Sequence, residues 1–226
     1  AQQMGVRDPG VLALAAGPGG HMWVGTRSGA AMWDGVTWRA FSPQDAGLTS
    51  ETVLALALDE MERVWMGTDR GLARLDLSEE AAPWTSYTAF SSSLPSNGIQ
   101  ALKADPRGGI WIGTGGGGLC LSNGEEWTCY RAGSSGLPWN TVTALALDDQ
   151  QRIWVATERP TETGGALAVL DVSNGPTWQT YTPRNSGLPS GQVNAILQDR
   201  QGQYWFATEF EGVCTYDPDR PRRSAN

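Results

Sequence analysis

The chain of 226 residues contains 24 acidic and 16 basic residues, which gives a formal net charge of −8 at neutral pH. This balance argues against a protein that binds the nucleic-acid backbone non-specifically, because such a protein needs a basic face. No apolar run approaches the roughly 18 residues of a membrane-spanning helix. The chain also does not begin with a charged segment followed by an apolar one, so neither membrane insertion nor a signal peptide is expected.

A five-residue pattern occurs five times along the chain: an apolar residue, Trp, an apolar residue, Gly or Ala, and Thr. The copies are Met22–Thr26, Val64–Thr68, Ile110–Thr114, Ile153–Thr157 and Tyr204–Thr208. Each copy is a short β-rich run bounded by turn residues. Successive tryptophans lie roughly 40 to 50 residues apart, a period typical of propellers and solenoids. The pattern therefore predicts a repeat protein built from β-strands.

The predicted elements follow the same order in each repeat, and the second repeat shows them most clearly. Its four strands are expected at Val53–Leu58, Val64–Thr68, Leu72–Leu77 and Trp84–Thr88. The first of these is almost continuously apolar, as in strands that are covered on both faces. The corresponding first strands of the other repeats are expected to begin at Val11, Ile99, Val142 and Val193. No window of useful length has the apolar periodicity of a helix.

Four short antiparallel strands per repeat predict an all-β fold, a β-propeller of five four-stranded blades. We expect a single domain over residues 1–226, with repeats at approximately 11–52, 53–98, 99–141, 142–192 and 193–226. Gly5-Val6 precedes the first repeat as Gly47-Leu48 precedes the second, so residues 1–10 are interpreted as the end of a link. Pro221–Asn226 stand where the fifth outer strand belongs, but they contain no aromatic residue. The blades either close as a five-bladed ring or form a fragment of a larger propeller.

Three cysteines are too few for a disulfide framework. Cys120 and Cys129 flank a turn at Ser122–Gly124, so they can face each other across one hairpin. A bridge would need Cα atoms within about 7 Å of each other. The pair is therefore either bridged or two small buried thiols, and Cys214 has no evident partner.

Two stretches resemble the two-component regulator propeller repeat: Asp105–Thr114 with Gly118-Leu119, and Asp148–Thr157. The resemblance extends over five copies. It implies an extracytoplasmic β-propeller sensor domain of the kind found in bacteria, often ahead of a membrane segment and a histidine kinase. Some members of the family sense sugars, and their rings usually have more than five blades.

Catalysis has few candidates in this sequence. The single histidine, His21, begins a repeated strand and is interpreted as a surface residue beside a turn. Adjacent carboxylates, which can serve a glycosidase when they face each other across a cleft, occur at Asp59-Glu60, Glu79-Glu80, Glu125-Glu126 and Asp148-Asp149. However, Asp59, Asp105, Asp148 and Asp199 share one repeat position and are expected to cap a turn. The sequence has neither a His/Cys cluster nor a loop of alternating acidic residues, so we expect no cofactor and no metal site.

Function in a repeat protein is expected where the repeats differ. The turns between second and third strands and the links between repeats should end on the same face of the propeller. The candidate ligand-binding residues on that face are Arg27, Asp69, Arg70, Trp139, Asn140, Glu158, Arg159, Glu209 and Phe210. Trp139 lies outside the repeat pattern, which makes it a candidate for stacking on a sugar or packing on a partner. The turn after Glu158 is the longest of its kind and could fold over this face.

The leading hypothesis is a non-enzymatic binding or sensor propeller that recognises a polar ligand, such as a carbohydrate, or a peptide. Converging Arg, Glu and Trp side chains suit a polar ligand. The expected partner is a small polar molecule or a protein, not nucleic acid, and the oligomeric state stays open. The alternatives are a structural protein–protein interaction module and, third, a propeller lyase or glycosidase. An extracytoplasmic location follows from the family resemblance alone.

Overall fold

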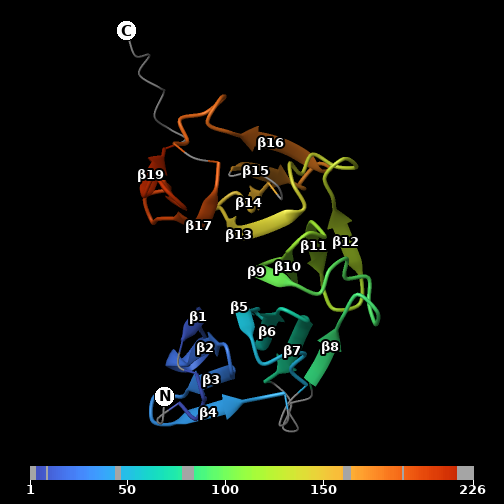
Figure 1. Ribbon diagram of the computed structural model, residues 1–226, viewed down its shortest axis with the longest axis vertical. Helices are drawn as coiled ribbons and strands as arrows, with labels where there is room; N and C mark the ends of the chain where they lie inside the picture. The colour runs from blue at the N-terminus through green and yellow to red at the C-terminus, as the bar shows by residue number, and fades with distance from the viewer. Residues whose placement is uncertain are drawn as a thin grey trace.

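The computed structural model describes residues 4–8, 10–43, 47–77, 84–159, 164–189 and 191–217. The described residues form five antiparallel sheets arranged as the blades of a propeller (Figure 1). Blade 1 consists of β1 (Val11–Ala16), β2 (Met22–Thr26), β3 (Gly29–Trp33) and β4 (Trp38–Phe41). Blade 2 consists of β5 (Val53–Leu58), β6 (Arg63–Thr68), β7 (Gly71–Asp76) and β8 (Trp84–Tyr87).

The remaining three blades repeat this meander. Blade 3 consists of β9 (Ile99–Asp105), β10 (Gly109–Thr114), β11 (Leu119–Ser122) and β12 (Trp127–Tyr130). Blade 4 consists of β13 (Thr141–Leu147), β14 (Ile153–Glu158), β15 (Gly165–Asp171) and β16 (Thr177–Tyr181). Blade 5 consists of β17 (Val193–Gln198), β18 (Tyr204–Thr208) and β19 (Val213–Tyr216).

The predicted all-β propeller of five blades is confirmed, and blades 1 to 4 have the predicted four strands. Within the described residues blade 5 has three strands, in the order β17-β18-β19. The sequence after Tyr216 lacks the Trp and the second aromatic residue that anchor the outer strand of every other blade. The stretch Pro221–Asn226, which was expected at that place, lies outside the described residues.

The inner strands β1, β5, β9, β13 and β17 stand side by side in chain order around a common axis (Figure 1). Each packs against the next, but β1 and β17 do not pack on each other as the interior neighbours do. The sequence left open a closed five-bladed ring or a fragment of a larger propeller. The described strands form an open arc rather than a closed ring, and blades 1 and 5 each have one face without a neighbouring blade.

The repeated Trp of the second strand forms the core between blades. Trp23, Trp65, Trp111 and Trp154 are buried. Each of these indoles lies beside the aromatic ring that ends the outer strand of its own blade, with centroid distances of 5.2 Å to Phe41, 5.9 Å to Tyr87, 6.3 Å to Tyr130 and 5.7 Å to Tyr181. Such rings bury large apolar areas and favour specific pair geometries, so this aromatic pair fixes how the outer strand closes its blade.

The small residue of the repeat pattern allows neighbouring blades to approach closely. A Cβ placed on Gly67 would lie 2.5 Å from the Ile99 side chain, and one on Gly113 would lie 2.5 Å from the Val142 side chain. Both contacts run from the second strand of one blade to the first strand of the next. The glycines are therefore required by packing between blades, since no Cβ fits in that space.

The links between repeats also contribute to the core. Each inserts one apolar residue into the core between the preceding and the following blade, and these buried residues are Leu48, Leu94, Leu137 and Leu188. Val6 is also buried, and a Cβ on Gly5 would lie 3.2 Å from Ala40 of blade 1, as one on Gly47 would lie 2.6 Å from Trp84 of blade 2. The interpretation of residues 1–10 as the end of a link is thus confirmed for the residues described there.

The predicted turn-capping role of the repeated Asp is confirmed, and the structure adds a second role. Asp59 Oδ1 accepts hydrogen bonds from the backbone N–H groups of Met61 (3.0 Å) and Arg63 (3.1 Å). Its other oxygen accepts from the indole N–H of Trp65 at 2.7 Å. Asp105, Asp148 and Asp199 accept the corresponding indole hydrogen bond at 2.8, 3.0 and 2.8 Å. The carboxylate therefore ties the turn to the core tryptophan of its own blade.

Asp105 shows the electrostatics of this arrangement. Burial raises the pKa of its carboxyl group, but hydrogen bonds and the charge of Arg107 outweigh that effect and lower the pKa below its usual value. The Arg107 guanidinium donates to Asp105 at 2.9 and 2.6 Å. The ionised carboxylate is thus the stable form inside the blade.

Blade 1 lacks this carboxylate. Gly17 occupies the Asp position, and its N–H donates to His21 O at 2.8 Å, as Asp59 N–H donates to Arg63 O at 3.1 Å. The indole nitrogen of Trp23 is buried without a hydrogen-bond partner. A buried donor left unpaired costs about 1 to 3 kcal/mol.

Replacing Gly17 by Asp is therefore expected to stabilise the protein by about 1 to 2 kcal/mol, by supplying the missing acceptor and by restricting the unfolded chain. The backbone at Gly17 is extended, with φ −113°, which Asp can adopt, and its Cβ would lie 3.0 Å from Cδ2 of Leu58, the end of a flexible side chain that has to shift slightly. Urea unfolding measures the effect. Gly17→Ala is the control, because it restricts the chain equally but supplies no acceptor. Equal stabilities of the two variants would contradict the prediction.

Cys120 and Cys129 form a disulfide, with their Cα atoms 4.1 Å apart on directly paired positions of β11 and β12. The bridged alternative is therefore correct, and Cys129 is exposed rather than a buried thiol. Disulfides persist in oxidising compartments and are rare in the cytosol. Cys214 is a free cysteine.

Candidate functional site

The links between repeats and the turns after the second strands meet on one face, as the sequence predicted. In blade 1, Gly29 N–H donates to Glu51 O of the following link at 2.6 Å. In blade 3, Gly118 N–H donates to Asn140 O at 2.8 Å. These hydrogen bonds hold the two kinds of connection together, so the variable residues of both lie on the same rim.

Arg27, Asp69 and Arg70 lie exposed on the turns that follow β2 and β6. Thr68 Oγ1 accepts a hydrogen bond from Arg70 N–H at 3.1 Å and so fixes the backbone of the second turn. These three candidates are therefore on the predicted rim, at the end of it that blades 1 and 2 form.

Asn140 takes part in the link itself. Its side-chain oxygen accepts a hydrogen bond from Ala132 N–H at 2.8 Å. In the preceding link Asn97 does the same for Ala89 N–H at 2.7 Å. The shared geometry indicates that both asparagines shape their links.

Blades 4 and 5 bring most of the other candidates together. The guanidinium of Arg159 lies over the Trp139 ring, 5.0 Å from its centroid. Glu158 accepts a hydrogen bond from the Gln192 amide at 3.0 Å, and Glu209 accepts one from the Asn194 amide. We name these six residues, Trp139, Glu158, Arg159, Gln192, Asn194 and Glu209, the 4/5 rim cluster.

The backbone connects the two halves of the 4/5 rim cluster, because Glu209 N–H donates to Gln192 O at 3.1 Å. Phe210 follows Glu209 and is 68% exposed. The rest of the long turn, Pro160–Thr163, lies outside the described residues, as does the predicted acidic pair Glu79-Glu80.

Sequence reasoning missed Gln192 and Asn194. Asn194 stands on β17 at the place that Leu54 occupies on β5, so the amide was a visible departure from the repeat. Its pairing with Glu209 depends on the antiparallel register of β17 and β18, in which Val193 lies opposite Thr208, and the repeat pattern alone does not show the side-chain contact.

A concave region lies on blade 1, away from the 4/5 rim cluster, with a volume of about 470 Å³. It is lined by Gly5, Val6, Arg7, Ser28, Ala40, Phe41, Ser42 and Glu51. Ser28 Oγ accepts a hydrogen bond from Asp8 N–H at 2.8 Å, which holds the chain before β1 against the turn after β2. Sequence reasoning missed this pocket because its walls come from segments far apart in the chain.

The described residues offer little for catalysis. They contain no group of three His, Cys, Asp or Glu side chains placed to hold a metal ion. Of the predicted carboxylate pairs, Asp59 and Asp148 serve their turns and indoles as described above. Within the same part of the chain, no helix has the length and apolar character that crossing a bilayer requires.

The family described as "Two component regulator propeller" matches residues 93–116, 136–159 and 187–210. Each matched segment runs from a link, through the first two strands of a blade, to the following turn. These segments are two-component regulator propeller repeats. The last two contain Trp139, Glu158, Arg159, Gln192, Asn194 and Glu209, so the 4/5 rim cluster lies within them. No curated protein matches the sequence.

Solved structures share the fold. The extracellular domain of BT3049 from B. thetaiotaomicron, described as a hybrid two component system, is 21% identical with a TM-score of 0.77, over 92% of this chain and 28% of that domain. A catalytically inactive virginiamycin B lyase from Staphylococcus aureus with quinupristin is 14% identical, with a TM-score of 0.67, over 95% of this chain and 72% of the lyase. This chain therefore spans a little over a quarter of the BT3049 domain, and both likenesses concern the fold.

Proposed function

We propose that these blades are the ligand-binding part of an extracytoplasmic sensor propeller, and that the 4/5 rim cluster binds a polar ligand of the carbohydrate class. The observation that supports the proposal is the Arg159 guanidinium held over the half-buried Trp139 ring. An aromatic face beside hydrogen-bonding side chains offers both an apolar platform and polar contacts to a sugar.

The neighbouring groups supply the polar contacts. Two carboxylates, Glu158 and Glu209, are each oriented by an amide side chain, Gln192 and Asn194 respectively. Carboxylates accept hydrogen bonds, whereas amides both donate and accept them. Such a set matches the hydroxyl groups of a sugar and disfavours an anionic ligand.

An extracytoplasmic location is part of the proposal. The disulfide between Cys120 and Cys129 is typical of oxidising compartments. The similar BT3049 structure is itself an extracellular domain. We propose no enzymatic activity for this chain, although a lyase shares its fold, because the buried repeated carboxylates serve turns and indoles.

Trp139→Ala and Arg159→Ala are each expected to weaken binding of a sugar found on a glycan array by at least about tenfold, or about 1.4 kcal/mol. The Trp139 side chain supplies the platform, and Arg159 orients it. Calorimetry measures the affinity, and unchanged circular dichroism confirms folding.

Trp33→Ala is the matched control, because Trp33 is a half-buried tryptophan of blade 1 that lies against Trp38 at 5.4 Å. Its affinity should match that of the wild type. Arg70→Ala shows whether the site extends to blade 2. If Trp139→Ala and Arg159→Ala both bound the sugar with the wild-type affinity, the proposed site would be wrong.

A protein–protein interaction module is the second candidate function, and the two end faces favour it. Val11 of blade 1 is 50% exposed, whereas Val53, at the same place in blade 2, is buried. Val213 of blade 5 is 63% exposed, whereas the corresponding Leu72 is buried. Each end face thus exposes an apolar position that is buried where a neighbouring blade is present, and exposed apolar surface of this kind can serve as an interaction site.

A further inference from the structure

The hydrogen bonds inside the 4/5 rim cluster use up donors and leave acceptors. An amide N–H of Gln192 donates to Oε1 of Glu158 at 3.0 Å, and an amide N–H of Asn194 donates to Oε2 of Glu209. In the described part of the chain, no donor reaches the second carboxylate oxygen of Glu158 or Glu209, or the amide oxygen of Asn194. The cluster therefore offers a ligand mainly hydrogen-bond acceptors.

Gln192 connects the two carboxylates, which come from neighbouring blades. Its side chain donates to Glu158, the last residue of β14, and its backbone carbonyl accepts from the N–H of Glu209 at 3.1 Å. Glu209 follows β18 directly. Like charges held in one network repel each other, and a positive charge bound beside them removes that repulsion.

The charge of the cluster is negative. It contains two carboxylates and one guanidinium, that of Arg159. The exposed Glu211 adds a further carboxylate to the turn that contains Glu209. The corresponding turns of blades 1 and 2 contain arginines, Arg27 and Arg70. The blade 4 and 5 end of the rim therefore attracts a cation and repels an anion.

The aromatic ring of the cluster is already placed against a cation. The Arg159 guanidinium lies 5.0 Å from the centroid of Trp139. The face of an indole ring attracts ammonium groups in the same way, through its quadrupole. Trp139 can therefore hold the apolar face of a sugar ring and also favour a positive charge close to it.

The groups that sugars carry differ in how well they match this set. A hydroxyl both donates and accepts, whereas an ammonium group has three donors and no acceptor. Hydrogen bonds from an ammonium to a carboxylate are also about twice as strong as neutral ones. A carboxylate or sulfate group brings only acceptors and a negative charge. The protonated amine is thus the group that fits an acceptor-rich, negatively charged cluster best.

We propose that the 4/5 rim cluster selects an amino sugar. The ammonium group of the sugar donates to the carboxylates of Glu158 and Glu209, while its ring lies on Trp139. This inference rests on the proposed function, which assigns the cluster to a carbohydrate, and it adds the charge of that carbohydrate.

The probes are three disaccharides of the same linkage: cellobiose, its analogue built from two glucosamine units, and the N-acetylated form of that analogue. We expect the wild type to bind the glucosamine disaccharide about tenfold more tightly than either of the others, because only that probe is charged. The preference should decrease as salt is added, since salt screens exposed charges. Calorimetry measures all three affinities.

Glu158→Gln and Glu209→Gln remove one charge each and keep the size of the side chain. Each should weaken binding of the glucosamine disaccharide about fivefold or more, while the affinity for cellobiose stays unchanged. The matched control is Glu51→Gln, because Glu51 is an exposed glutamate of the rim beside blades 1 and 2. It changes the net charge equally and should bind like the wild type. Equal losses in all three variants would contradict the assigned carboxylates.

The outcomes separate this inference from the proposed function. If a neutral sugar from the glycan array bound at least as tightly as the glucosamine disaccharide, the preference for an amine would be wrong and the carbohydrate site would stand. If neither the array nor the three disaccharides gave any binding, the proposed function would fall as well.

Discussion

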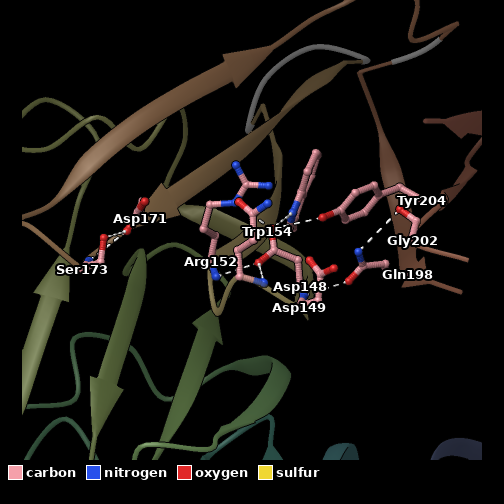
Figure 2. A network of polar contacts seen from close by, with 10 residues as sticks. Asp148, Asp149, Arg152, Trp154, Asp171, Ser173, Gln198, Gly202 and Tyr204 are labelled. Atoms are coloured by element: carbon pink, nitrogen blue, oxygen red, sulfur yellow. Dashed lines mark hydrogen bonds and ion pairs between the residues drawn. The ribbon is translucent and has the colours of Figure 1, made fainter. Parts of the chain in front are cut away.

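Replacing Asp148 by Ala is expected to lower the free energy of unfolding by about 3 to 5 kcal/mol, the range for breaking a buried ion pair. The Asp148 carboxylate is buried and accepts hydrogen bonds from Arg152 Nε at 2.8 Å, Trp154 Nε1 at 3.0 Å and Tyr204 Oη at 3.0 Å (Figure 2). Tyr204 belongs to blade 5, so this one carboxylate joins two blades. Its removal leaves the buried donors of Trp154 and Tyr204 without an acceptor and leaves the partly exposed Arg152 without its ion-pair partner.

The matched control for Asp148 is Asp199→Ala, at the same repeat position in blade 5. Asp199 accepts from the Trp205 indole at 2.8 Å, but it forms no ion pair among the described residues and lies near solvent. Water can replace the lost acceptor there, so we expect a clearly smaller loss. Urea unfolding of both variants measures the difference. Equal losses of unfolding free energy would contradict the role of Asp148 in joining blades 4 and 5.

Trp111→Ala should have a comparable effect, about 3 to 5 kcal/mol, as for other large core residues. Trp111 is fully buried, stacks on Tyr130 at 6.3 Å and donates to Asp105 at 2.8 Å. The substitution leaves a large cavity between blades 3 and 4 and removes one of the donors that stabilise the ionised Asp105. Thermal or urea unfolding measures the loss.

Trp205→Ala is the control for Trp111, because both residues stand at the same place in the repeat. Trp205 is 40% exposed and has no stacked ring among the described residues. We expect less than half the loss found for Trp111→Ala. A similar loss in both variants would mean that the repeat position itself, rather than burial between blades, determines the contribution of the indole.

Much of the fold could be predicted from local patterns. The strand expected at Val53–Leu58 has those bounds in β5, and the one expected at Trp84–Thr88 differs from β8 (Trp84–Tyr87) by one residue. Alternating and continuous apolar runs bounded by turn residues carry this information locally. The last blade could not be predicted with the same success, because its outer strand depends on aromatic residues that this sequence lacks.

The candidate site was predictable only in part. The variable residues of turns and links were expected on one face, and Asn140 and Glu209 lie there. The contact between Arg159 and Trp139 was not predicted, nor was the pairing of Asn194 with Glu209. Both contacts join residues of one blade that the sequence separates, so they depend on how the turn after the second strand lies against the first strand or the link before it.

The sequence by itself determined the repeat, its strands and the buried tryptophans, because a β-rich period of this length can bury its apolar faces only against copies of itself. Only the tertiary structure decided which faces and edges found a partner. Trp65 and Trp205 share one sequence pattern, yet one lies between blades and the other at an uncovered end. Burial depends on the neighbouring blade, and neither residue's own sequence context specifies whether that neighbour is present.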